Sequence, residues 1–81
     1  MTELEATHSH LYPGATGRAL AEPADGPVVI RFSDGSSATG TLDGDRLALG
    51  AYTTTAGTRV APRAFRLAFD PAGGFRVTAR A

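Results

Sequence analysis

From Pro27 onward, hydrophobic and polar residues alternate with a period of two along the chain. The stretches with this pattern are 28–32, 38–42, 47–51, 65–69 and 75–79. Because successive side chains of a β-strand point to opposite faces, the pattern predicts antiparallel strands with one buried face. Five or six short strands at this spacing are typical of a small barrel or sandwich. We therefore predict a mostly β fold, with a small antiparallel β domain over residues 27–81.

The turn residues between these stretches predict which side chains face each other. A three-residue loop over 33–35, with Gly35 in the left-handed conformation, sets Ile30 opposite Ala38 and Val28 opposite Gly40. A two-residue loop would instead pair apolar with polar residues, because a slip of one residue moves every side chain to the other face. We therefore expect the three-residue loop.

The next turn, at 44–45, fits a loop of two residues. This loop sets Leu42 opposite Leu47 on the apolar face. It also sets Asp43 opposite Arg46, which predicts an exposed cross-strand ion pair that contributes less than about 1 kcal/mol. The pair would help to fix the register of the two strands more than it would stabilise them.

The last hairpin has the clearest turn. Its sequence over 70–73 is Asp-Pro-Ala-Gly, with Pro where a type I turn needs a fixed φ and Gly where φ is positive. The facing pairs that this turn predicts are Phe69 with Phe75, Leu67 with Val77 and Phe65 with Ala79. Residues 52–60 form a further candidate hairpin around Ala56-Gly57.

The first 26 residues have a different pattern. Thr2 and Glu5 have the spacing of a capping box, and Leu4, His8 and Leu11 fall at helical spacing. The Pro13-Gly14 step would end such a helix. Because a helix of about ten residues is marginal unless it packs on something, we predict an N-terminal arm or a short docked helix over residues 1–26.

Composition and charge exclude several classes of protein. The chain has no cysteine, so disulfides, thiolate chemistry, zinc–thiolate sites and iron–sulfur sites are excluded. No apolar stretch reaches the length of about twenty residues that crosses a membrane, and the acidic N-terminus does not have the pattern of a secretory signal. Acidic and basic residues balance at 8 each. We expect a soluble, cytoplasmic protein that does not bind membranes.

The sequence offers no convincing catalytic group. A nucleophilic serine needs a base that a third group orients, and the histidines lie far in sequence from the serines of the 33–37 turn. The aspartates at 34, 43 and 45 are turn residues, and neither a Walker A nor a dinucleotide-binding pattern is present. We therefore expect no catalytic residues and no cofactor, and an enzyme is the least supported class.

His8 and His10 form the only histidine pair in the chain. On a strand, the two rings would lie on one side and could supply half of a metal site. A zinc site needs at least one more protein ligand, and no recognisable third position follows in the sequence. The plainer interpretation is two exposed histidines; the alternative is a metal site that another subunit completes.

Charge is distributed unevenly along the chain. Residues 1–45 contain seven acidic and two basic side chains, a net charge of −5, whereas residues 59–81 contain five arginines and one aspartate, a net charge of +4. In the predicted register, Arg66, Arg76 and Arg80 share the outward face of the last hairpin, and Arg63 lies just before it. Arginine suits bidentate contacts to carboxylates or phosphates.

These observations favour a non-enzymatic interaction module. We expect a homo-oligomer or a small subunit of a larger assembly, in which the acidic N-terminal segment or a protein partner covers the arginines. The alternative is binding of a nucleic-acid phosphate backbone through Arg63, Arg66, Arg76 and Arg80. Against the alternative, no aromatic residue lies between the arginines to stack on bases, and overall neutrality weakens long-range attraction.

Overall fold

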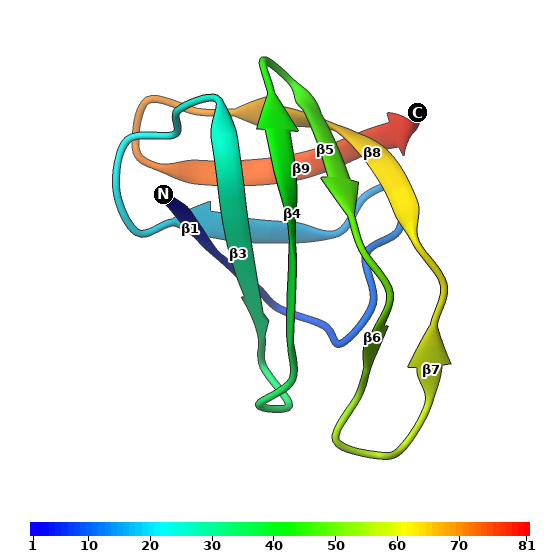
Figure 1. The fold of residues 1–81 in the computed structure, drawn as a ribbon. Helices are drawn as coiled ribbons and strands as arrows, with labels where there is room; N and C mark the ends of the chain where they lie inside the picture. Colours follow the sequence, from blue (N-terminus) through cyan, green and yellow to red (C-terminus); the bar gives the residue numbers. More distant parts are fainter.

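The computed structural model describes all 81 residues and consists of strands joined by turns and loops (Figure 1). The strands are β1 (Thr2–Ala6), β2 (Thr16–Ala19), β3 (Gly26–Phe32), β4 (Ser37–Asp43), β5 (Arg46–Leu49), β6 (Tyr52–Thr53), β7 (Arg59–Val60), β8 (Arg63–Phe69) and β9 (Gly74–Arg80). The structure has no helix that is long and apolar enough to cross a membrane.

Seven of the strands close into a barrel in the order β1-β2-β9-β8-β5-β4-β3. The parallel pairing of β1 with β3 closes the barrel, and all other neighbours are antiparallel. The short strands β6 and β7 form a separate hairpin that extends from one end (Figure 1). The predicted mostly β fold and small barrel are confirmed, with seven barrel strands in place of five or six.

Residues 1–26 form neither an arm nor a short helix, which corrects the sequence-based prediction for this segment. They contribute β1 and β2 to the barrel wall, and Leu4 and Ala6 of β1 are buried in the core. β1 has a neighbouring strand on each side, and the two ladders of backbone hydrogen bonds outweigh the weak propensity of a short helix. In the sequence, Glu3 and Glu5 alternate with Leu4 and Ala6, a period-two signal that the helical interpretation overlooked; in the structure the glutamates are half-buried and Leu4 and Ala6 are buried.

The registers predicted for the first two hairpins of the 27–81 region are confirmed. In β3 and β4, Ile30 faces Ala38, and Gly35 in the turn has a φ of +92°. In β4 and β5, Leu42 faces Leu47. Both registers place apolar side chains on the inner face of the barrel, as the alternation predicts.

The last hairpin follows the prediction only as far as the middle of the strands. Phe69 faces Phe75 and Leu67 faces Val77 as predicted, but Phe65 faces Arg80 in place of Ala79. The register shifts because β9 has one residue more than β8 across this point, which makes a β-bulge near Thr78. The side chain of Thr78 donates a hydrogen bond to the Arg66 carbonyl oxygen at 3.2 Å.

The core is one continuous cluster of 15 buried apolar residues inside the barrel. The largest fully buried side chains are Leu4, Val28, Ile30, Leu42, Leu47, Phe65 and Val77. Leu11 and Ala15, from the loop between β1 and β2, are also buried in the cluster. This loop is attached to β9 by backbone hydrogen bonds from Gly14 to Val77 and from Val77 to Ala15.

Candidate functional site

Two of the predicted arginines lie together on the outside of the barrel. Ala68 of β8 faces Arg76 of β9, and Arg66 is two residues from Ala68 along the same strand. Facing residues in an antiparallel pair point to the same side of the sheet, so Arg66 and Arg76 are diagonal neighbours on the outer surface. Both are exposed.

The other two predicted arginines lie elsewhere. The bulge places Arg80 opposite Phe65, whose side chain points into the barrel, so Arg80 does not share the outward face of Arg66 and Arg76. This corrects the predicted cluster of three arginines. Arg63 faces Leu49 at the same end of the barrel and lines a small pocket there.

Sequence reasoning missed a third arginine beside Arg76. β2 pairs with β9, and this pairing sets Thr16 opposite Arg76 and Arg18 opposite Gly74. Arg18 is therefore a diagonal neighbour of Arg76 on the side away from Arg66. The position of β2 beside β9 depends on contacts far apart in sequence, and the period-two pattern does not encode it. We call Arg18, Arg66 and Arg76 the arginine face.

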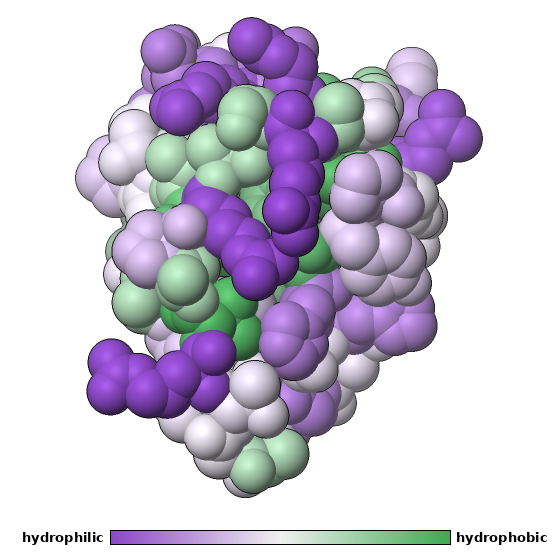
Figure 2. Space-filling view, turned by 90° about the vertical axis from the view of Figure 1, so that its right-hand side faces the viewer, coloured by the Kyte–Doolittle hydropathy of each residue, from purple (hydrophilic) through white to green (hydrophobic).

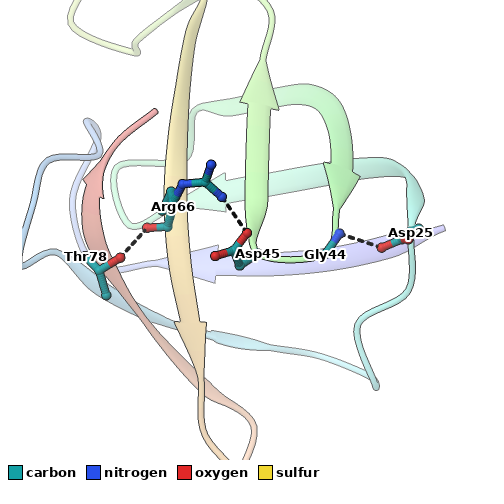
Figure 3. Close-up of polar contacts among 5 residues, drawn as sticks. All are labelled: Asp25, Gly44, Asp45, Arg66 and Thr78. Atoms are coloured by element: carbon teal, nitrogen blue, oxygen red, sulfur yellow. Dashed lines mark hydrogen bonds and ion pairs between the residues drawn. The ribbon is translucent and has the colours of Figure 1, made fainter.

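Carboxylates hold the two outer members of the arginine face. Arg18 donates through Nε to Glu5 Oε1 at 3.1 Å, and Arg66 donates through Nη1 to Asp45 Oδ1 at 2.8 Å (Figure 3). Their side chains remain 71% and 52% exposed. A guanidinium group has five N–H donors, so each ion pair orients the arginine and leaves further donors free.

The central member, Arg76, has no ion-pair partner. It borders an open groove of about 380 Å³ that runs across β2, β9 and β8, and Thr16, Ala68 and Gly74 are among the residues that line the groove. Figure 2 views the side of the barrel around β7 and β8, where long hydrophilic side chains stand over small, weakly hydrophobic residues. The arginine face therefore combines positive charge with a groove beside Arg76.

The predicted ion pair between Asp43 and Arg46 does not form, although the two residues face each other as expected. Asp45, in the turn between them, instead pairs with Arg66 of β8, because β8 lies beside β5 in the barrel. The same turn is held from its other side by Asp25, whose Oδ1 accepts a hydrogen bond from the Gly44 amide at 2.8 Å (Figure 3).

The acidic N-terminal residues do meet arginines, but not those of the C-terminal hairpin. Glu5 pairs with Arg18, and Glu3 lies 3.6 Å from Arg31 of β3. These glutamates are part of β1, so they cannot fold over the last hairpin as a free arm would. The arginines without any ion-pair partner are Arg46, Arg59, Arg63, Arg76 and Arg80.

His8 and His10 lie in the loop between β1 and β2. The His8 ring packs against Tyr12, with the ring centroids 5.5 Å apart, and His10 Nδ1 lies 3.2 Å from the Ser9 hydroxyl. No group of three His, Cys, Asp or Glu side chains comes together in the structure.

Two side chains have a shifted pKa, and local structure explains both. Hydrogen bonds from the Ser36 hydroxyl and amide lower the pKa of Asp34 in the turn between β3 and β4. Burial raises the pKa of the Tyr52 hydroxyl, which donates to the Ser9 carbonyl oxygen at 2.8 Å. Shifted pKa values often mark active sites, but a turn carboxylate and a packed tyrosine do not form one.

Comparison with protein-family models, curated proteins and solved structures finds no match for this chain. Function is therefore inferred from geometry and charge alone.

Proposed function

We propose that this chain is a non-enzymatic interaction module that binds an acidic partner protein through the arginine face. The observation that carries the proposal is the position of Arg76. It is exposed, has no ion-pair partner, lies between two oriented arginines and borders a groove. Oriented guanidinium groups beside a groove suit carboxylate side chains of a partner, because bidentate contacts require fixed geometry.

The chain has few free acids of its own to cover this face. Glu3 and Glu5 are engaged with Arg31 and Arg18. The carboxylate of Asp70, which also lines the groove, accepts hydrogen bonds from the backbone amides of Ala72 and Gly74. Another molecule is therefore the better source of the carboxylates, as expected for a small subunit of a larger assembly.

A nucleic-acid backbone is the alternative ligand for the same arginines. Phosphates would bind them as carboxylates do, but single-strand binders also use aromatic side chains on which bases stack. The phenylalanines of β8 and β9 belong to the core, with Phe65 and Phe75 buried and Phe69 partly buried. Phe69 and Phe75 line the groove beside Arg76, but Phe75 is buried and Phe69 is half-buried, so neither ring is fully exposed for a base to stack on, and a protein partner is favoured.

The proposal is tested by fluorescence anisotropy with two labelled probes, an oligo-glutamate peptide and a mixed-sequence oligonucleotide. We expect the peptide to bind at low salt and R76Q to weaken its binding by about tenfold, since a hydrogen bond to a charged group contributes about 1.5–3 kcal/mol. R59Q is the matched control, because Arg59 is also exposed and without an ion pair but lies on β7.

Three outcomes would count against the proposal. If R76Q and R59Q lowered the affinity for the peptide equally, the net charge of the chain alone would account for the binding. Tighter binding of the oligonucleotide, with the same dependence on Arg76, would favour the phosphate-backbone alternative. No binding of either probe would overturn a role for the arginine face in binding anions.

A further inference from the structure

The outer surface of β3, β4, β5 and β8 contains an uncharged region. The strand registers set one residue from each strand in a row across the barrel, and two further residues extend the row along β3 and β4. The members are Pro27, Val29, Thr39, Thr41, Ala48 and Ala64, and we call them the neutral face. All are exposed or half-buried, and none carries a charge.

A row of charges borders the neutral face at the end where β4 turns into β5. Asp43 of β4 faces Arg46 of β5, and Arg46 in turn faces Arg66 of β8. Asp25, which directly precedes β3, lies beside the same turn through its hydrogen bond to Gly44 (Figure 3). From β3 through β4 and β5 to β8, the row therefore contains two negative charges followed by two positive charges.

The two central charges of this row are unpaired. Asp43 and Arg46 face each other and are both exposed, yet neither makes an ion pair within the chain. A surface with one free acid beside one free base can be complementary to itself. A two-fold axis that lies in the contact plane and passes between β4 and β5 brings Asp43 of each copy against Arg46 of the other.

The same axis also brings uncharged residues of the two copies against each other, and it brings a further acid toward a base. It places the neutral residue of β4, Thr41, against Ala48 of the other copy, and it places Pro27 against Ala64. At the ends of the charged row, it brings Asp25 toward Arg66. Among the four charges of the row, no pair of like charges is created by this arrangement, so the row meets the requirement of an isologous contact.

We infer that a second copy of this chain packs on the neutral face, and that reciprocal ion pairs between Asp43 and Arg46 fix the orientation of the dimer. The self-complementary order of the charges favours a second copy over an unrelated partner, for which no such symmetry is needed. The contact does not include Arg76, which carries the proposed function; Arg66 of the arginine face lies at the edge of the contact.

The test is a charge-swap experiment with the full chain, in which sedimentation equilibrium measures the mass. Wild type should approach twice the monomer mass at high protein concentration. D43R alone places two like-charge contacts in the interface, and so does R46D alone. Each variant should therefore lower the association constant by at least about tenfold. Circular dichroism confirms that both variants are folded.

Mixing the two variants supplies the decisive measurement. In a heterodimer of D43R with R46D, each Arg of one variant meets an Asp of the other, so both ion pairs are restored, one of them with reversed polarity. The mixture should associate about as strongly as wild type, although neither variant does so alone. The matched controls E22R and R59D change the net charge equally at exposed residues outside the neutral face and should leave the dimer intact.

A wild-type chain that stays monomeric at every concentration would overturn the inference. Dimers that persist in both single variants, or a mixture that remains monomeric, would also overturn it. None of these results depends on Arg76, so the inference can fail while binding of the acidic peptide survives.

Discussion

At the scale of single residues, the close approach of β4 and β5 leaves no room for a side chain at position 40. Gly40 of β4 faces Leu49 of β5 on the inner side of the barrel. A Cβ atom at this position would collide with the backbone carbonyl of Ala48 and with the Leu49 Cα. Gly40 is thus required by close approach and not by an unusual φ.

We expect G40A to lower the free energy of unfolding by about 1–3 kcal/mol or more, because the neighbouring strand must move to accept the methyl group. G50A is the control: the nearest atom to a Cβ there is the Thr39 oxygen at 3.5 Å, an ordinary contact. G50A should stabilise the protein slightly or leave its stability unchanged. Chemical denaturation measures both, and equal effects would show that β4 and β5 are not packed this closely.

At the scale of elements, the β6–β7 hairpin is the smallest unit and has few contacts of its own. Two of its contacts to the barrel are the Tyr52 ring, which stacks on Phe32 with a centroid distance of 5.0 Å, and the Thr55 hydroxyl, which donates to the Asp34 carbonyl oxygen at 3.1 Å. The Tyr52 hydroxyl also donates a hydrogen bond to the Ser9 carbonyl oxygen in the loop after β1. One side chain therefore joins three segments that are distant in sequence.

We expect Y52F to lower the free energy of unfolding by about 1 kcal/mol, since the ring remains and only the hydrogen bond is lost. Hydrogen exchange of amides in β6 and β7 should become faster than in wild type. Y12F is the control, because Tyr12 is 45% exposed and its hydroxyl makes no hydrogen bond within the chain. Unchanged exchange in Y52F would mean that other contacts hold the hairpin.

At the scale of the whole molecule, closure of the barrel depends on the N-terminal residues. β1 pairs with β3, and β2 pairs with β9, so this pair of strands joins the two edges of the sheet that the rest of the chain forms. Without these strands, the edges of β3 and β9 would be unpaired, and the core would lose Leu4 and Leu11. Exposed edges and a reduced core are unfavourable for a chain of this size.

Removal of residues 1–24 should therefore abolish cooperative unfolding, as measured by circular dichroism during heating. The sequence-based division into residues 1–26 and 27–81 leads to the opposite expectation, since a separate β domain would fold alone. A truncated chain that unfolds in a single sharp transition would support that division. Addition of a synthetic peptide of residues 1–24 should restore folded structure if barrel closure is the missing element.

Much of the fold could be predicted because hairpins are local. The alternation of residue types and the turn at Gly35 are sufficient to pair Ile30 with Ala38, and the same reasoning pairs Leu42 with Leu47. The bulge near Thr78 could not be predicted, because the alternation and the turn at 70–73 fix the pairing near the turn and do not reveal an extra residue farther along β9. It separates Arg80 from Arg66 and so changes the candidate site.

The sequence alone determined the class of fold, the inward faces of β3, β4, β5 and β8 and the excess of arginine in the C-terminal third. These properties follow from periodicity and composition, which require no knowledge of distant contacts. Only the tertiary structure decided that β2 lies beside β9, that Arg18 joins Arg66 and Arg76, and that Asp45 takes the place of Asp43 as an ion-pair partner. Barrel closure brings together strands far apart in the chain, and their order depends on packing of the whole core.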